Sequence, residues 1–344
     1  GAEGAGMRIF AAALPAALAA LAALPAGAMT PGARARAALR SARVPLERAD
    51  YAAAAARLDL ALKLAPGWKT ASGLRALCRW SLGENAGAAE DARYALKLRP
   101  NDALSFEARG YARLVGGDDR GAAEDFRVAA RLSGGEAEAR FGLGSALSSQ
   151  GKQAEAIREL DAAIRLKPRF AAAWVVRGAA KQRLRDFEGA IADFSEALNI
   201  NPGLLWVKLY RGRALREIKE YKRSLSDLDD FVAANPGRAD AIYLRGNVRF
   251  LSGDYRGAIR DLDRIIKLKP RNGLAYSNRG QAKAALGDSR GALADLRQAL
   301  KLDPERKARI EAAIAALEAG ERRPADARGE PKAPEAGGGG VFVK

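Results

Sequence analysis

Apolar and small side chains recur at three- and four-residue spacing through most of this chain, a pattern typical of amphipathic helices. In the stretch 275–304, two such runs lie on either side of Gly287 and Asp288. Glycine commonly ends a helix and aspartate commonly begins one, so this stretch predicts two helices joined by a tight turn. Pro304 then ends the second helix, because proline cannot continue it.

The same pattern returns every 34 residues without insertion or deletion. The recurring prolines are Pro66, Pro100, Pro168, Pro202, Pro236, Pro270 and Pro304. The proline absent from position 134 is replaced by Gly134, which also ends helices. The eight units begin at Ala35, Lys69, Ala103, Ala137, Ala171, Leu205, Ala239 and Gly273. A fixed period of this length indicates helical pairs that bury their apolar faces by stacking on their neighbours.

The unit resembles the tetratricopeptide repeat, which carries small residues near the middle of each helix and a proline near its end. The resemblance covers residues 35–306 and implies an all-α fold. That fold is a right-handed α-solenoid of about eight 34-residue helix-turn-helix repeats with a C-terminal capping helix. The aromatic residue that the family carries at position 4 is kept as Phe106, Trp174 and Tyr276, and is replaced by Arg140, Lys208 and Ile242.

Five segments follow from this pattern. Pro45 interrupts the first helix of the first unit, so that unit is expected to be degenerate or to act as a cap. The predicted segments are an N-terminal extension and signal peptide at 1–28, a degenerate first repeat at 29–68, seven tetratricopeptide repeats at 69–306, a capping helix at 307–320 and a disordered linker at 321–344.

The leader has the order of a secretory signal. Met7 and Arg8 precede an Ala- and Leu-rich run at 9–24, which ends in small residues up to Ala28. This order predicts cleavage after Ala28 and export to the periplasm or the exterior, with an uncleaved anchor or an accidental leader as alternatives. The apolar run is shorter than a spanning helix requires, so we expect no stable membrane span after cleavage.

The C-terminal residues are rich in Pro, Gly and mixed charge, which is typical of a flexible linker. The last four residues, 341–344, look like the start of a strand. The sequence is therefore expected to be a fragment of a longer protein.

Composition narrows the chemistry. The 344 residues include no His and one Cys, which excludes a His general base, a Ser-His-Asp triad, a His-ligated metal and a Cys-rich zinc site. No phosphate-binding loop or EF-hand pattern is present. We therefore expect no enzymatic activity, no catalytic residues, no cofactor and no metal.

An arginine recurs at position 7 of the unit and an aspartate at position 23. The arginines are Arg75, Arg109, Arg177, Arg211, Arg245 and Arg279. Their partners are Asp91, Asp125, Asp193, Asp227, Asp261 and Asp295. Among the seven units from Lys69 onward, the one without this arginine has Leu143 and Glu159 instead. Both positions face the interior of the helical pair, so we predict a buried or half-buried structural ladder of Arg–Asp pairs.

The resemblance also implies that the first helix of each unit lines a concave groove. The apolar and aromatic residues at its groove positions are Tyr111, Phe141, Val175, Trp206, Leu209, Tyr243 and Phe250. An exposed apolar band of this kind predicts a protein or peptide ligand. Packing between neighbouring units is the alternative reading of the same residues.

Two asparagines occupy positions that carboxylate-clamp members of the family use to hold a peptide. Asn247 is at position 9 of the seventh unit and Asn278 at position 6 of the eighth. The resemblance implies that they could hold a peptide backbone, because an amide both donates and accepts hydrogen bonds. The lysine of that clamp is replaced by Tyr243, and its further basic residues by Ala308 and Ala312, which argues against a carboxylate clamp.

The leading hypothesis is an exported, non-enzymatic scaffold that binds a protein or peptide in its groove and assembles a complex at the cell envelope. Two alternatives remain, a recruiting arm of a larger enzyme and a basic surface for a polyanion. The net charge is +17, from 58 Lys and Arg against 41 Asp and Glu, and its largest share lies in residues 205–306. The dispersed charges and the leader argue against nucleic acid as the partner. The sequence leaves the oligomeric state open.

Overall fold

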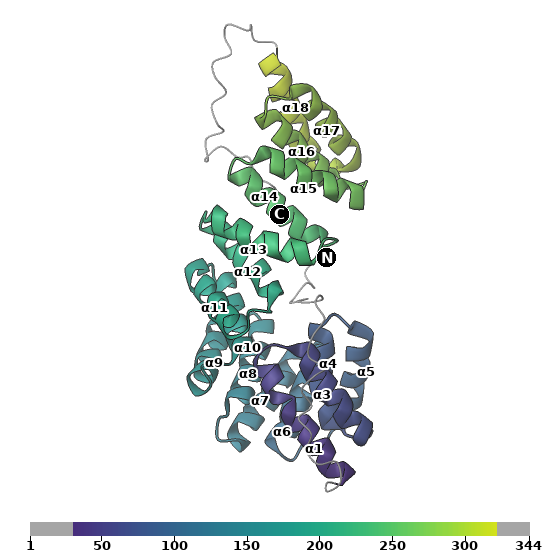
Figure 1. The fold of residues 1–344 in the computed structure, drawn as a ribbon, viewed down its shortest axis with the longest axis vertical. Helices are drawn as coiled ribbons and strands as arrows, with labels where there is room; N and C mark the ends of the chain where they lie inside the picture. The colour runs from purple at the N-terminus through teal and green to yellow at the C-terminus, as the bar shows by residue number, and fades with distance from the viewer. Residues whose placement is uncertain (1–29, 322–344) are drawn as a thin grey trace. The chain divides into compact units, whose positions relative to one another are not determined.

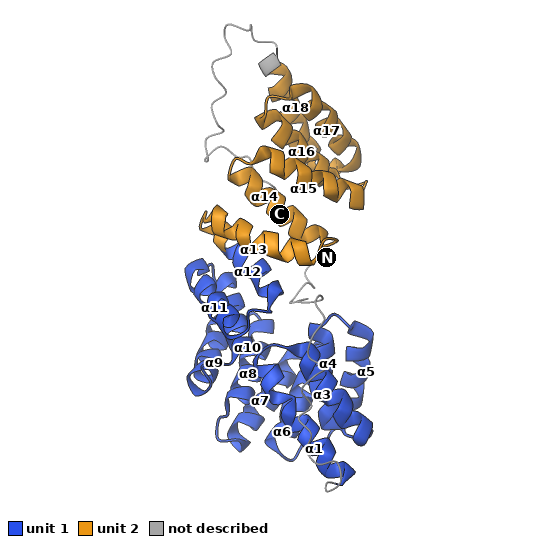
Figure 2. Cartoon of the chain, in the orientation of Figure 1, with its two compact units in different colours: residues 1–214 blue, residues 215–344 orange. Residues whose placement is uncertain are grey.

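The computed structural model describes residues 30–321, and every regular element within that range is helical (Figure 1). The predicted leader at 1–28 lies outside the described residues, as does the predicted linker after Glu321. The chain divides into two compact units, residues 1–214 (unit 1) and residues 215–344 (unit 2), coloured separately in Figure 2. The all-α helix-turn-helix architecture predicted from the sequence is confirmed.

Unit 1 contains the helices of the first five repeats and most of the next helix. They are α1 (Pro31–Ser41), α2 (Arg43–Glu47), α3 (Tyr51–Leu64), α4 (Lys69–Ser81), α5 (Asn85–Ala95), α6 (Ala103–Val115), α7 (Asp119–Leu132), α8 (Ala137–Ser149), α9 (Gln153–Leu166), α10 (Ala171–Arg183), α11 (Phe187–Ile200) and α12 (Leu205–Glu217), whose last turn belongs to unit 2.

Unit 2 continues the same alternation. Its helices are α13 (Tyr221–Ala234), α14 (Ala239–Leu251), α15 (Tyr255–Leu268), α16 (Gly273–Ala285), α17 (Ser289–Leu302) and α18 (Lys307–Glu321), with a 3₁₀ turn at Pro304–Arg306. Helices α16 and α17 are the pair expected on either side of Gly287 and Asp288, and they pack against each other. No helix within residues 30–321 combines the length and the apolar character needed to cross a bilayer.

A short aspartate-capped turn joins the two helices of a repeat. Gly287 has a φ of +84°, a conformation that glycine adopts without steric cost. Asp288 then accepts a hydrogen bond from the backbone N–H of Gly291 at 2.9 Å through Oδ1, which caps the N-terminus of α17. The same Asp-x-x-Gly cap begins α7, α11 and α15.

Glycine at position 8 allows the two helices of a repeat to approach closely. A β-carbon added to Gly178 would lie 2.9 Å from the ring of Phe194, and one added to Gly110 would lie 2.8 Å from Phe126. Both phenylalanines are fully buried. The small residues of the repeat therefore make room for the largest core side chains.

The two ends of the described region close the stack differently. At the N-terminal end the first helix of the first unit is broken, because α1 ends at Ser41 and a short α2 containing Pro45 follows. At the C-terminal end, α18 packs on α17 and buries Ile310 against Leu296 and Ala299. The half-buried side chains of Ala313, Ile314 and Leu317 extend that contact.

Candidate functional site

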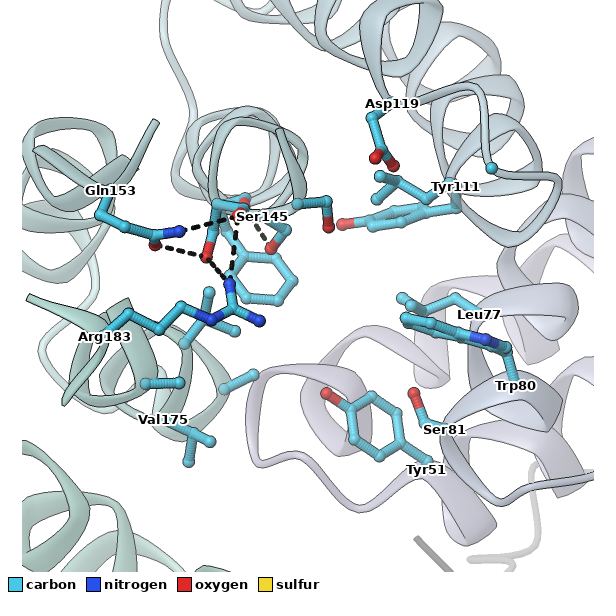
Figure 3. Close-up of a pocket in the computed structure, with 18 of the residues that line it drawn as sticks. Tyr51, Leu77, Trp80, Ser81, Tyr111, Asp119, Ser145, Gln153, Val175 and Arg183 are labelled. Atoms are coloured by element: carbon cyan, nitrogen blue, oxygen red, sulfur yellow. Dashed lines mark hydrogen bonds between the residues drawn. The ribbon is translucent and has the colours of Figure 1, made fainter. Parts of the chain in front are cut away.

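A pocket of about 960 Å³ lies within unit 1, lined mainly by the first helices of successive repeats. The lining includes Trp80 of α4, Tyr111 of α6, Phe141 of α8, Val175 of α10 and Trp206 of α12. Figure 3 shows Tyr51, Ser81 and Trp80 on one side of this space and Gln153 and Arg183 on the other. An apolar concavity of this size with a few polar groups is typical of a ligand-binding site.

Ring contacts fix the aromatic lining in place. Tyr111 meets Phe126 edge-on, with ring centroids 4.9 Å apart. The rings of Phe141 and Phe170 are also 4.9 Å apart, and Trp206 meets Tyr210 edge-on at 6.1 Å. Because these partners belong to the packed core or to its edge, the pocket presents preorganised apolar surface.

A hydrogen-bonded polar corner lies at one side of the pocket (Figure 3). Gln153 accepts from the Ser148 hydroxyl and donates to the Ser148 carbonyl oxygen, each at 3.0 Å. Nη1 of Arg183 donates to the same hydroxyl and carbonyl oxygens at 3.1 Å. Within residues 30–321, Arg183 forms no salt bridge. The corner therefore holds a positive charge at the pocket through neutral partners.

A carboxylate lines the same pocket. Asp119, at the start of α7, is half-buried, and burial raises its pKa, with a further contribution from the neighbouring charge of Asp118. The pocket thus offers one cation and one anion within a mainly apolar wall. A peptide backbone or an amphipathic segment could satisfy both.

The structure brings together four of the predicted groove residues at this pocket, Tyr111, Phe141, Val175 and Trp206. It buries the first three to 4–6 % exposure, in contrast with the solvent-facing band expected from the sequence. The reason is that consecutive first helices pack on one another and cover most of each side chain. Leu209 is buried in α12 and is not part of the lining.

Three of the predicted residues in unit 2 make polar contacts within that unit. Asn278 is fully buried and donates from Nδ2 to the hydroxyl of Tyr243. Its Oδ1 atom is buried without a hydrogen-bond partner. Nη1 of Arg216 lies 3.4 Å from Oδ1 of the buried Asn247. Phe250 packs instead on the ring of Tyr255, at 5.3 Å.

The charged side chains that act on Tyr243 are arginines. Burial raises the pKa of its hydroxyl, while the hydrogen bond from Asn278 and the charges of Arg306, Arg216 and Arg309 oppose that shift. The role of Asn247 and Asn278 in holding a peptide backbone stays a prediction.

The Arg–Asp pairs have bidentate geometry. Arg245 donates from Nε to Asp261 Oδ2 at 3.0 Å and from Nη2 to Oδ1 at 2.5 Å. The same two bonds, at 2.6–2.9 Å, join Arg177 to Asp193 and Arg279 to Asp295. Each of these aspartates is at most 5 % exposed. The pair Arg211 and Asp227 is divided between the two units and stays a prediction.

Each pair has further partners that the predicted ladder did not include. A second cation, at position 11, reaches the buried aspartate, as Arg249 does to Asp261 at 2.9 Å. A second carboxylate comes from position 25 of the preceding repeat, as Asp229 bonds to Arg245 at 2.9 Å. The position-25 aspartates are Asp59, Asp161, Asp229 and Asp263. These aspartates recur at multiples of 34 residues in some of the repeats, and this recurrence could have predicted their role from the sequence.

The exceptional repeat has its own pair. Glu159 bonds to Nη1 of Arg140 at 3.0 Å, so the cation moves from position 7 to position 4. In three other repeats position 4 carries an aromatic ring beside the position-7 guanidinium, and Trp174 lies 4.5 Å from Arg177 in one of them. Arg140 and Leu143 therefore belong together: the arginine stands at position 4 instead of position 7, and Glu159 still has a cationic partner.

Within the part of the chain that the structure describes, no three Cys, Asp or Glu side chains are placed to hold a metal ion. The only cysteine in the sequence, Cys78, is fully buried, and burial raises the pKa of its thiol.

Comparisons with known proteins agree with this architecture. Models described as tetratricopeptide repeat match residues 107–168, 141–204, 209–273 and 274–306, which together cover more than half of the chain. No curated protein sequence matches the chain.

Among solved structures, the chain is similar to YrrB, described as a TPR protein with an unusual peptide-binding site. The identity is 22 %, the TM-score 0.52, and the match covers 58 % of this chain and 99 % of YrrB. It is also similar to the APC/C hetero-tetramer Cut9-Hcn1, at 14 % identity and a TM-score of 0.61, covering 81 % of this chain and 55 % of that one. These likenesses concern the fold. Together with the repeat period and the family matches, they show that the chain belongs to the tetratricopeptide-repeat family.

Proposed function

We propose that the chain is an exported, non-enzymatic tetratricopeptide scaffold that binds a peptide segment of a partner protein in the groove of unit 1. In this proposal it mediates the assembly of a complex at the cell envelope. The observation that carries the binding role is the pocket of about 960 Å³, whose wall is aromatic and aliphatic. The peptide-binding site described for YrrB supports the same class of ligand.

The lining indicates the chemistry of the ligand. Trp80, Tyr111, Phe141 and Trp206 offer ring surface to apolar side chains. Arg183 offers a guanidinium to a peptide carbonyl or carboxylate, held in place by its bonds to Ser148. We expect an amphipathic segment with several apolar residues and at least one acceptor group. No catalytic step is part of this function.

The test uses the full chain and a displayed library of random peptides. Selected peptides are titrated against the wild type, with intrinsic tryptophan fluorescence as the readout, to which Trp80 and Trp206 of the pocket contribute. Ala179→Arg places a long charged side chain at a half-buried position of the pocket wall. We expect this variant to bind at least about tenfold more weakly, because the arginine fills space that the ligand needs.

Ala284→Arg is the matched control, since Ala284 is also half-buried on a first helix but lies in unit 2. Its affinity should equal that of the wild type. Equal affinity of Ala179→Arg and Ala284→Arg would place the ligand elsewhere and refute the groove assignment.

The export proposal rests on the leader and is tested separately. Expression of the full sequence in a Gram-negative host should give a periplasmic product whose N-terminus begins at Met29. Replacing Ala28 by Phe should block cleavage, because the residue before the cut must be small. A cytoplasmic product that retains Met7 would contradict the proposal.

A further inference from the structure

Residues 42–49, which we call the N-terminal strap, contact parts of unit 1 that are far away in the sequence. Nζ of Lys167 lies 2.7 Å from Glu47 Oε1, and Nδ2 of Asn201 donates to the Arg48 carbonyl oxygen at 3.0 Å. Helix α2 of the strap also packs on α10. The strap therefore links the first repeat to the fourth and fifth repeats within unit 1.

The strap covers a small cavity that adjoins the main pocket. This cavity, of about 30 Å³, is lined by Arg43, Leu46 and Glu47 of the strap and shares four residues with the main pocket. The shared residues are Tyr51, Leu77, Tyr111 and Phe141. Removing the strap would open this cavity into the groove and lengthen it.

Leu46 and Glu47 of the strap occupy positions that two neighbouring side chains of a bound peptide could occupy. Leu46 is half-buried at the core, and the cavity that it lines has a wall of Leu74, Leu104 and Phe170. The next residue, Glu47, places its carboxylate on Lys167. We call the wall residues Leu74, Leu77, Leu104 and Phe170, with Lys167 and Glu138, the strap subsite.

Ala42 and Ala49 at the two ends of the strap are buried in the core, whereas the ion pairs that hold the residues between them are weak. Lys167 is 38 % exposed and is shared between Glu47 and Glu138, and Arg43 lies 3.5 Å from Glu138. Ion pairs at partly exposed sites contribute little net stability. Ala49, at the end of the strap, has a φ of +57°, a strained conformation for a residue other than glycine.

A buried carboxylate beneath the strap also opposes closure. Glu107 of α6 is 3 % exposed, and its Oε1 atom has no hydrogen-bond partner. Burial raises its pKa to about 7. The charged or titratable groups around it are Arg43 and Glu47 of the strap, Tyr51 of α3, Tyr111 of α6, Glu136 and Glu138 of α8, and Lys167.

We propose that the strap is a releasable intramolecular ligand, and that its subsite also accepts an apolar residue followed by a carboxylate from a partner peptide. The proposal rests on the proposed function of the groove in unit 1. It adds the chemistry of the partner peptide, which presents an apolar residue followed by a carboxylate in a turn, as Leu46 and Glu47 do. The strap and the partner peptide then compete for the same subsite, so the partner binds when the strap is released.

The first experiment weakens the strap and leaves its subsite unchanged. The double variant Leu46→Ser/Glu47→Gln is prepared in the full chain, and the probe is a fluorescein-labelled peptide with the sequence of residues 42–50. We expect the double variant to bind this peptide, and the wild type to bind it at least about tenfold more weakly, because the strap competes at high effective concentration. A probe with Ser and Gln in place of its Leu and Glu should bind neither protein.

Hydrogen–deuterium exchange of residues 42–50 reports directly whether the strap has opened. Increased exchange in the double variant without binding of the probe would overturn the proposal, as would equal affinity of the two proteins. Neither result would affect the Ala179→Arg test at the main pocket, so failure of the strap proposal is distinguishable from failure of the proposed function.

A second measurement needs no substitution in the strap. Opening exposes Glu107 and releases its proton, so exchange of residues 42–50, corrected for the intrinsic rate, should rise about tenfold between pH 6 and pH 8. Glu107→Gln should remove this rise, whereas Glu124→Gln, at an exposed position of α7, should keep it. An unchanged exchange rate between the two pH values, or the same rise in Glu107→Gln, would overturn the proposal.

Discussion

The two units use the same ion-pair framework and different groove side chains. In unit 1, Asp125 accepts two bonds from Arg109 and lies 3.2 Å from Arg113. In unit 2, Asp261 has the same relation to Arg245 and Arg249. The framework is therefore a property of the repeat and is independent of the unit in which it lies.

The groove positions differ between the units. In unit 1 they carry Tyr111, Phe141 and Val175, which line the pocket. In unit 2 they carry Tyr243, Asn247 and Phe250. Tyr243 and Asn247, with Asn278 at position 6, make polar contacts near Arg216, while Phe250 packs on Tyr255. The repeat thus fixes where a side chain lies, while the residue at that position decides between apolar packing and buried polar contacts.

The largest expected effect comes from breaking the shared framework. Asp261→Ala leaves Arg245 and Arg249 without their buried partner and should lower the free energy of unfolding by about 3 kcal/mol. Asp125→Ala should cost a similar amount in unit 1. Thermal and urea unfolding of both variants, and of Asp261→Asn, would measure this.

Asp263→Ala is the matched control. Asp263 bonds to Arg279 at 2.6 Å, but its side chain is 51 % exposed. We expect a loss below about 1 kcal/mol, since exposed ion pairs contribute little. Unchanged melting temperatures in Asp261→Ala and Asp261→Asn would refute a stabilising role for the ladder.

A smaller, pH-dependent effect is expected at Glu107 in unit 1. Its pKa is raised from an ordinary value of 4.5 to about 7, because burial disfavours the charged form. Below pH 4.5 the group is neutral in the folded and unfolded states and costs nothing. As the pH rises from 4.5 to 7, the unfolded chain loses the proton first, so stability falls.

Glu107→Gln should therefore stabilise the protein by up to about 3 kcal/mol at pH 8 and leave it unchanged at pH 4. Unfolding in urea at the two pH values measures the difference. The same gain at both pH values would contradict the titration argument, and Glu124→Gln serves as the exposed control.

The smallest effect is expected at the buried asparagines of unit 2. Asn278→Ala removes the hydrogen bond to the Tyr243 hydroxyl and should cost about 1 kcal/mol. Asn247→Ala loses only a 3.4 Å contact with Arg216 and should cost less. If every peptide selected on this protein binds the Asn247→Ala/Asn278→Ala double variant with unchanged affinity, the backbone-holding role of the two asparagines is refuted.

The sequence predicted the repeat and the Arg–Asp pairs because both depend on spacing within one unit. Positions 7 and 23 always lie on facing sides of the same helical pair, so Arg245 and Asp261 could be paired from their numbers alone. Asp229 was missed, because its contact with Arg245 depends on how one repeat stacks on the next. The burial of Tyr111 and Phe141 has the same origin.

The sequence by itself determined the helical period, the turn residues and the Arg–Asp pairs, since each follows from local geometry repeated every 34 residues. Only the tertiary structure decided that Trp80, Phe141 and Arg183 meet around one pocket, because those helices come from different repeats. It alone placed Glu47 on Lys167, a contact across 120 positions that no local pattern specifies. Long-range contacts depend on the curvature of the stack, which is the sum of many small packing angles between repeats.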